Sequence, residues 1–206
     1  MPEVIKRIIT SLLLILFLII SINYIYVLFF LLIICCYEIF YEFFSIIKKI
    51  FISKKNKIHL YIFSLILLIY ITFINLEIFN IFLFDITKKK ETFYLIVTIC
   101  ISTDVGGYVF GKIFKGPKLT KISPNKTYAG MFGGYFLSIM FIIIYSKYVN
   151  QPINLLSLIT VIFISSISQI GDIVVSYFKR LSKLKNTGII LPGHGGILDR
   201  IDGMLF

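Results

Sequence analysis

The chain contains a succession of apolar runs, each long enough to cross a lipid bilayer as a helix. A transmembrane helix needs about 20 apolar residues to span a hydrocarbon core of roughly 30 Å. Six runs approach that length, and they cover approximately residues 5–20, 24–47, 58–76, 92–110, 128–145 and 153–175. Because 58% of the 206 residues are hydrophobic, a soluble class is excluded. We therefore predict an all-α, polytopic transmembrane helix bundle with about six spans.

Two stretches leave alternatives to this span count. The first run follows Lys6 and Arg7 and is divided from the second only by residues 21–23, an arrangement that a signal peptide can also have. No small-residue cleavage site follows it, so we interpret it as an uncleaved first span. Residues 77–84 could form a further short or interfacial helix. A full span there would place two basic loops on opposite sides of the membrane, which disfavours it.

Charge placement supports this count and orients the chain. When the N-terminus is placed in the cytoplasm, 17 of the 21 Lys and Arg residues fall on the cytoplasmic side, in agreement with the positive-inside rule. The two loops richest in polar residues, 112–127 and 178–200, then share that face. The net charge of +11 is therefore explained without nucleic acid, and we find no basic soluble domain to bind one. We expect an integral membrane protein whose active site faces the cytoplasm.

Two acidic residues inside predicted spans stand out, because ionisable groups are costly there and mark functional sites. Asp104 is in the fourth predicted span, and Asp172 is near the cytoplasmic end of the sixth. Helical spacing places Asp172 on one stripe with three later residues, which are Ser176, Lys179 and Lys183. Such a stripe would lead from an acid at the membrane boundary to cations at its surface. The alternative is that Asp172 only forms a buried ion pair with Lys179 or Arg180.

Carboxylates near the C-terminus add a candidate metal site. Asp199 and Asp202 are three residues apart, so they face the same way if the segment is helical. Together with Asp172 they offer oxygen ligands of the kind that Mg²⁺ prefers when it bridges the phosphates of a substrate. The expected cofactor is Mg²⁺, alone or together with a second, monovalent cation.

Glycines occur in two kinds of place. A turn from Pro192 to Gly196 interrupts the polar segment between the last span and the C-terminal carboxylates. Glycine allows backbone N–H groups to approach an anion closely, and His194 could donate a hydrogen bond to a phosphate. The alternative is a tight turn before a final helix. Two further pairs, Gly107–Gly111 and Gly130–Gly134, have small-xxx-small spacing, which predicts helix packing rather than ligand binding.

The loop before the fifth predicted span is a second polar island. Ser123 and Pro124 break the chain, and Ser123 could cap the turn that follows. Lys126 stands close to the predicted N-terminus of the span, where the helix dipole disfavours a cation. A bound phosphate would compensate this charge. The alternative is that Lys126 is a basic flank of the membrane span.

Taken together, these motifs resemble the signature of the phosphatidate cytidylyltransferases, also called CDP-diacylglycerol synthases. The matching positions extend over 27 residues, and they are Ser176, Lys179–Arg180, Lys185–Asn186, Pro192–Gly196 and Asp199–Asp202. Upstream, Asp104 with Gly107–Tyr108 and the segment 123–127 are similar to two other islands of that family. The resemblance begins near Ser102. It divides a single domain of residues 1–206 into generic spans in 1–91 and a catalytic half in 92–206.

What the resemblance implies is the transfer of a cytidylyl group from CTP to phosphatidate at the lipid bilayer, giving CDP-diacylglycerol and pyrophosphate. It implies a catalytic set of five residues, which are Asp172, Asp199, Lys179, Arg180 and His194. It also implies a substrate-binding set, which consists of Ser123, Lys126, Ser176, Lys185, Gly195, Gly196, Arg200 and Asp104. Asp172, Asp199 and Asp202 would hold the Mg²⁺ ion. Relatives suggest a homodimer and a location in the bacterial inner membrane.

Three features depart from the family pattern. Asn186 stands where the family generally has Asp, and Ala129 stands where it often has Glu. The chain ends at Phe206, where relatives usually continue into another span. These departures keep an inactive, membrane-bound member of the family as one alternative. A CTP-dependent lipid kinase, or a cytidylyltransferase for another lipid phosphate, is the other.

Overall fold

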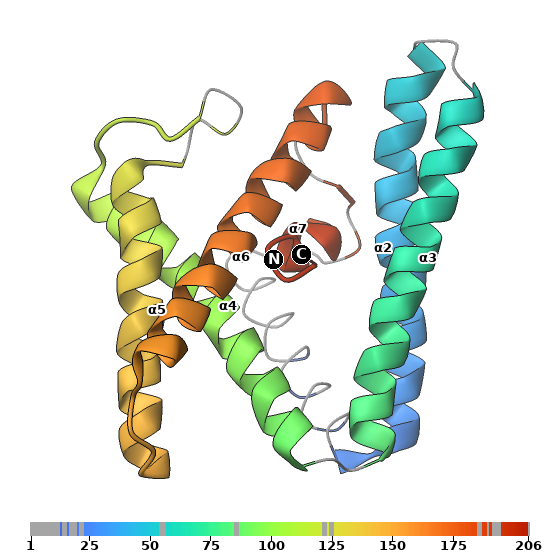
Figure 1. The fold of residues 1–206 in the computed structure, drawn as a ribbon. Helices are drawn as coiled ribbons and strands as arrows, with labels where there is room; N and C mark the ends of the chain where they lie inside the picture. Colours follow the sequence, from blue (N-terminus) through green and yellow to red (C-terminus); the bar gives the residue numbers. More distant parts are fainter. Residues whose placement is uncertain are drawn as a thin grey trace. The chain divides into compact units, whose positions relative to one another are not determined.

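Long helices make up most of the computed structural model, which describes residues 23–53, 57–84, 87–120, 123, 126–184, 187, 188, 190 and 195–205 together with Leu13, Leu16 and Ile20. Its elements are α2 (Ile25–Ser53), α3 (Lys57–Leu83), α4 (Thr87–Phe114), α5 (Tyr128–Val149), α6 (Leu155–Leu181) and the short α7 (Leu198–Ile201) (Figure 1). Five of them, α2 to α6, are long and apolar enough to cross a membrane. The predicted all-α, polytopic class is therefore confirmed. The first predicted span, over residues 5–20, lies mostly outside the described part of the chain and stays a prediction.

The helices extend beyond the apolar runs that predicted them. α3 continues to Leu83, so residues 77–83 belong to the third predicted span and form no separate helix. α4 begins at Thr87, ahead of its apolar run, and takes three lysines into its first turn. An apolar run marks only the part of a helix that lies in hydrocarbon, whereas backbone hydrogen bonding continues past that boundary.

The chain divides into two compact units, each built from two separate stretches of sequence. The first unit contains Met1–Lys90 and Phe178–Arg200, and the second contains Glu91–Tyr177 and Ile201–Phe206. The division passes through α4, α6 and α7, and each unit is described by itself below.

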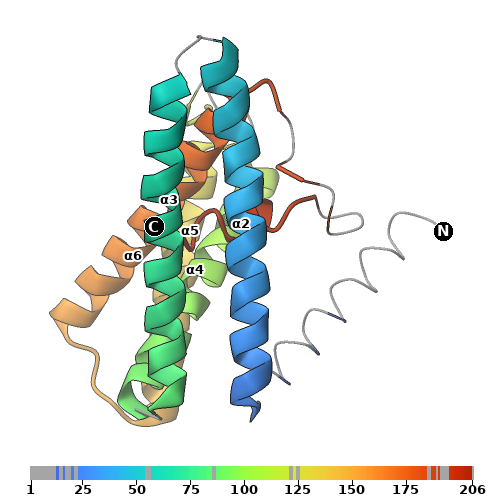
Figure 2. The same cartoon turned by 90° about the vertical axis from the view of Figure 1, so that its right-hand side faces the viewer.

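In the first unit, α2 and α3 lie antiparallel and in contact with each other (Figures 1 and 2). Aromatic side chains hold the pair together, since the ring centroids of Phe29 and Phe79 are 4.9 Å apart. The last turn of α6 also belongs to this unit. Its Phe178 packs against Phe43 of α2, with ring centroids 5.5 Å apart. The unit therefore draws together residues that are far apart in the sequence.

In the second unit, α4, α5 and α6 pack through small and polar residues. A Cβ atom added to Gly130 of α5 would stand only 2.7 Å from the carbonyl oxygen of Gly107 in α4, so the two backbones touch. The prediction that these glycines serve helix packing is confirmed. Thr103 Oγ1 donates a hydrogen bond of 2.9 Å to Ser165 Oγ, which links α4 to α6. The apolar core of this unit is formed by Ile99, Ile142 and Val161.

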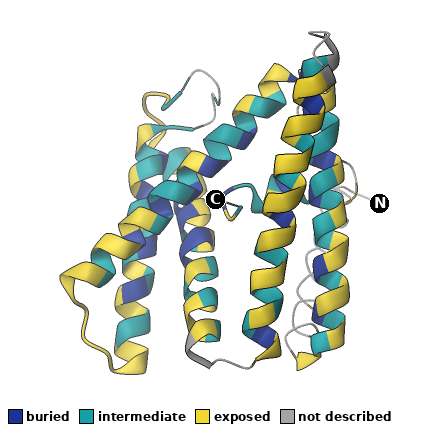
Figure 3. Ribbon diagram, turned by 45° about the vertical axis from the view of Figure 1, so that its right-hand side comes forward, coloured by how far each residue is buried: buried dark blue, intermediate teal, exposed yellow. Residues whose placement is uncertain are grey.

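Exposed residues are frequent along all the long helices (Figure 3), and many of them are large and apolar. On α3, Tyr61, Leu65 and Ile69 are all more than half exposed. A soluble monomer rarely exposes contiguous apolar surface of this extent. Such surface is stable when lipid tails surround it, so the burial pattern agrees with an integral membrane protein.

Candidate functional site

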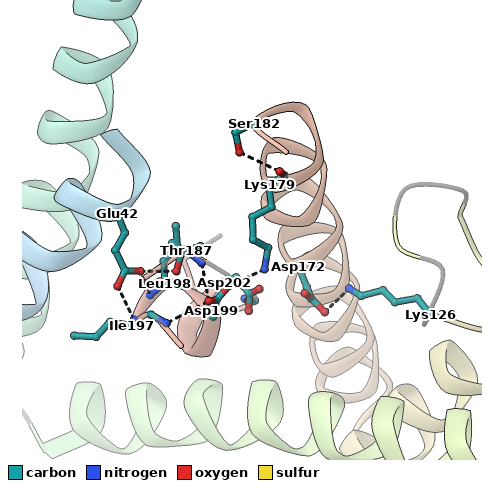
Figure 4. Close-up of polar contacts among 12 residues, drawn as sticks. Glu42, Lys126, Asp172, Lys179, Ser182, Thr187, Ile197, Leu198, Asp199 and Asp202 are labelled. Atoms are coloured by element: carbon teal, nitrogen blue, oxygen red, sulfur yellow. Dashed lines mark hydrogen bonds and ion pairs between the residues drawn. The ribbon is translucent and has the colours of Figure 1, made fainter. Parts of the chain in front are cut away.

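The chemistry-bearing residues form two clusters, one in each unit. In the first unit, the Glu42–Asp199 cluster consists of Glu42, Lys179, Thr187, Gly196 and Asp199. In the second unit, the Asp172 cluster consists of Asp104, Lys126 and Asp172. Figure 4 shows hydrogen bonds of the first cluster and the Lys126–Asp172 ion pair of the second.

Asp199 is held by three donors that come from two parts of the first unit. Lys179 Nζ donates to Oδ1 at 2.8 Å. The backbone N–H groups of Thr187 and Gly196 donate to Oδ2 at 2.9 and 3.2 Å. Burial by itself raises the pKa of Asp199, but the hydrogen bonds and the charge of Lys179 outweigh it, so the pKa lies below its ordinary value. The side chain is therefore an ionised carboxylate at neutral pH.

The end of α6 sets the position of Lys179. The helix stops at Leu181, where Lys183 adopts a left-handed backbone conformation with φ of 56°. The N–H of Leu184 then returns to the carbonyl oxygen of Lys179 at 2.9 Å, which closes the helix end. The predicted stripe is therefore correct as far as Lys179, in the last turn, and wrong for Lys183, because the chain has already left the helix there.

Glu42 of α2 is a buried acid that the sequence analysis missed. Only 1% of its surface is exposed, and its carboxylate accepts three hydrogen bonds from residues far along the chain. Thr187 Oγ1 donates to Oε2 at 2.6 Å. The N–H groups of Ile197 and Leu198 donate to Oε1 and Oε2, each at 3.0 Å. The signal was present in the sequence, since Glu42 is an acid inside a predicted span.

Glycines allow the loop to close around these two carboxylates. A Cβ atom at Gly188 would stand 2.6 Å from Glu42 Oε1, and one at Gly196 would collide with both Thr187 Oγ1 and the Glu42 carboxylate. Gly195 has φ of 87°, a conformation that glycine adopts without strain. We predicted that glycines here would let N–H groups approach an anion, and in this unit the anions they approach are the protein's own carboxylates.

The second unit contains an ion pair between Lys126 Nζ and Asp172 Oδ2. Both side chains are partly buried, with 23% and 31% of their surface exposed. The charges of both act on the carboxyl group of Asp104 in α4, so the three residues form one electrostatic cluster. Asp172 therefore supplies an anion for Lys126, which explains a cation near the start of α5 in a way that the sequence analysis did not foresee.

Backbone hydrogen bonds connect the described residues of the loop before α5. Leu119 N–H donates to Lys126 O at 2.8 Å, and Lys126 N–H donates to Ser123 O at 3.0 Å. The cap that we predicted for the Ser123 side chain stays a prediction. The side-chain cap of α5 is Thr127, whose Oγ1 accepts from Gly130 N–H at 3.1 Å.

The C-terminal residues of the second unit pack against α6. A Cβ atom at Gly203 would lie 2.7 Å from Ser168 Oγ and 3.7 Å from Oδ1 of Asp104. Asp202 directly precedes this contact, and its Oδ1 accepts from Gly203 N–H at 3.1 Å. α7 ends at Ile201, so Asp199 is in the helix and Asp202 is in the turn after it.

The remaining predicted residues fall into two groups. Ser176 lies on α6, one turn after Asp172, and Arg180 and Arg200 are exposed, in the last turn of α6 and in α7. Lys185 and His194 lie outside the described residues. Among its described residues, neither unit by itself groups three His, Cys, Asp or Glu side chains that could hold a metal ion. The Mg²⁺ ligand set therefore stays a prediction.

The carboxylate oxygens of these acids are suitable ligands for a hard cation. A carboxylate has about four lone-pair sites, and the three donors on Asp199 use three of them. The ion pair on Asp172 involves Oδ2. Oxygen atoms of this type are the ligands that Mg²⁺ takes in proteins.

A comparison with protein families matches residues 5–206 to one described as the cytidylyltransferase family. Among curated proteins, the chain is 42% identical over 124 residues to a phosphatidate cytidylyltransferase of Staphylococcus epidermidis, a match that covers 58% of this chain and 48% of the relative. It is 40% identical over 127 residues to the protein of that name from Staphylococcus haemolyticus, covering 60% and 49%. A third such relative, from Staphylococcus aureus, is 42% identical over 124 residues and covers 58% and 48%. The chain thus matches about half the length of these curated relatives.

Proposed function

Because the chain belongs to the cytidylyltransferase family, we propose that it transfers a cytidylyl group from CTP to phosphatidate at a bacterial membrane. The named relatives are phosphatidate cytidylyltransferases. The observation that carries the proposal is the pairing of membrane-boundary lysines with carboxylates, Lys126 with Asp172 and Lys179 with Asp199. Each carboxylate holds its ammonium group in place before any phosphate arrives.

The proposed reaction joins two anions. A phosphate oxygen of phosphatidate attacks the α-phosphorus of CTP, the bond from that phosphorus to the β-phosphate oxygen breaks, and pyrophosphate leaves. The attacking oxygen is already anionic, so the reaction needs no strong general base. Its barrier comes from the repulsion between the substrates and from the charge that develops on the leaving group. Positioned cations weaken the repulsion between the substrates and stabilise the charge on the leaving group.

The residues of this chain are assigned roles on that basis. Lys126, Lys179, Arg180 and Arg200 would hold the phosphates. His194 with Gly195 and Gly196 would shape the pocket for the triphosphate, together with Ser123, Ser176 and Lys185. Asp104 would support the Asp172 cluster from α4.

Mg²⁺ is the cofactor that the carboxylates suit. Asp172 and Asp199 would bind it, with Asp202 as a third ligand or as a hydrogen-bond partner of its waters. The ion would neutralise negative charge on the triphosphate and on the departing pyrophosphate. In this proposal the active site faces the cytoplasm, where CTP is found, and the homodimer suggested by the resemblance stays a prediction.

Labelled CTP provides the decisive test. The purified protein is incubated in lipid with phosphatidate, Mg²⁺ and CTP that carries the label in either the α or the γ phosphate. A cytidylyl transfer moves the α label into the lipid product and releases the γ label as pyrophosphate. Movement of the γ label into lipid would instead identify a kinase, and no labelled lipid in either reaction would contradict the proposed activity.

A further inference from the structure

Glu42 connects a membrane helix of the first unit with the loop that precedes Asp199. We call residues 182–197, between α6 and α7, the C-terminal loop. The Glu42 carboxylate is the acceptor for one hydroxyl and two backbone N–H groups from this loop and the first residue of α7. Three hydrogen bonds to one buried carboxyl group form a strong anchor, because each buried donor would lose its partner if the loop moved away.

The same loop residues also hold Asp199. Thr187 donates through its hydroxyl to Glu42 and through its N–H to Asp199. Gly196 donates its N–H to Asp199, and the next N–H in the chain, that of Ile197, goes to Glu42. Thr187 by itself, and Gly196 together with Ile197, therefore donate hydrogen bonds to both carboxylates (Figure 4). A shift of the loop at Glu42 would move the donors of Asp199 as well.

We infer that Glu42 is a positioning residue for the proposed cytidylyl transfer, and that it fixes the C-terminal loop on α2 so that Asp199 is held in one orientation. The inference rests on the proposed function for its catalytic consequence. Its structural part, the anchoring of the loop, rests only on the contacts above. Glu42 itself reaches no substrate in this role and acts through Thr187 and Gly196.

The substitution Glu42→Gln tests the anchor at nearly constant volume. An amide has one oxygen, whereas the carboxylate uses both of its oxygens as acceptors. If the amide oxygen replaces Oε2, the Ile197 N–H faces an NH₂ group. If the amide oxygen replaces Oε1 instead, the NH₂ group faces the Leu198 N–H. In either orientation one buried N–H loses its acceptor, which is costly in a site that excludes water.

Glu38 offers a matched control. It lies one turn earlier on the same helix, carries the same charge and is only half-buried. It makes none of the three bonds that Glu42 accepts from the C-terminal loop. Thr187→Val is a milder second variant, since it removes the hydroxyl donor and keeps the backbone N–H that Asp199 accepts.

The experiment combines hydrogen–deuterium exchange with steady-state kinetics on the full chain in lipid nanodiscs. We expect Glu42→Gln to speed exchange in residues 195–200 by about tenfold or more, and exchange in α5 to stay unchanged. We expect the kcat of Glu42→Gln to fall by at least about tenfold, with a smaller change in its KM for CTP. Glu42→Asp should retain a kcat between those of Glu42→Gln and the wild type. Thr187→Val should also speed exchange and lower kcat, but by less than Glu42→Gln. Glu38→Gln should match the wild type in both measurements.

Wild-type exchange at residues 195–200 in both Glu42→Gln and Thr187→Val would overturn the inference. If Glu42→Gln also speeds exchange in α5, the substitution has unfolded the chain, and Thr187→Val alone then decides. A wild-type protein without cytidylyl transfer would contradict the proposed function. The exchange measurement would still decide whether Glu42 anchors the loop.

Discussion

Asp199 and Asp172 are both paired with lysines, but their surroundings differ at the scale of single residues. Asp199 accepts one ammonium and two backbone N–H groups in the first unit. Asp172 lies on a membrane helix, where Lys126 is its ion-pair partner. Both are proposed ligands of Mg²⁺, but neutralisation of Asp199 should in addition disturb the order of the loop that donates to it, whereas neutralisation of Asp172 should affect mainly the chemistry.

The pKa of Asp199 predicts how the order of the C-terminal loop depends on pH. Because that pKa is lowered in the folded protein, the bonds of Asp199 contribute their full stability above the unfolded-state pKa of about 3.9. The contribution is lost as the pH falls through the lower, folded-state pKa. We expect Asp199→Asn to have a lower melting temperature than the wild type at neutral pH, and the difference to shrink at acidic pH. A difference that stays constant down to a pH of about 2 would contradict this assignment.

Asp172→Asn should remove most of the turnover and leave the fold intact. The change is nearly isosteric, but it takes away the anion beside Lys126 and a proposed ligand of Mg²⁺. We expect kcat for cytidylyl transfer to fall by at least about 100-fold, with membrane insertion and melting temperature close to wild type. Glu77→Gln, the loss of an exposed acid on α3, is the control and should retain full activity. An Asp172→Asn protein with wild-type turnover would remove Asp172 from the site.

At the scale of helices, the crossing of α4 and α5 depends on glycines in a position-specific way. A Cβ atom at Gly106 would collide with the backbone of Gly133, whereas one at the adjacent Gly107 would be 3.7 Å from the carbonyl oxygen of Gly130, an ordinary contact. Two neighbouring glycines on one helix therefore differ sharply in whether they leave room for a side chain, because an added Cβ atom at Gly106 would point directly at α5 and one at Gly107 would not.

This difference makes a paired prediction. Gly106→Ala should push the helices apart and destabilise the protein by about 1–3 kcal/mol, as overpacking of a close contact does. Gly107→Ala should leave the melting temperature unchanged or raise it slightly, because alanine favours the helix. Thermal unfolding of both variants in the same lipid checks the prediction. Equal melting temperatures would show that the two backbones do not touch at Gly106.

At the scale of the whole molecule, the positive-inside rule predicts opposite exposure for the two ends of α5. Lys118 precedes this helix and Lys147 lies in its last turn, and both are exposed. In a chain whose three cysteines are replaced by serine, we expect Lys118→Cys to react with an impermeant maleimide from the cytoplasmic side only. Lys147→Cys should react from the other side only. Labelling of both from one side would refute the orientation.

The sequence predicts the helices of this molecule better than the contacts of its charged residues. The described spans were found because the hydrocarbon core demands apolar length, which is a local property of the chain. The role of Gly107 and Gly130 in helix packing was found from spacing along each helix. The partners of Glu42 and Lys126 were missed, because Thr187 is 145 residues from Glu42 and no periodicity connects them. The end of α6 was missed because Lys183 adopts a left-handed conformation without being glycine.

The distance in sequence between Glu42 and its donors has a consequence for biosynthesis. Glu42 is made 145 residues before Thr187. At ordinary translation rates of 5–20 residues per second this is an interval of about 7–29 seconds. Throughout that time a carboxyl group enters the bilayer without the donors that will later surround it. The loop can therefore dock on Glu42 only after residues 187–198 have been made. A nascent chain stalled before residue 187 would therefore hold, in its membrane helix, an acid that lacks the hydrogen-bond donors of the finished protein.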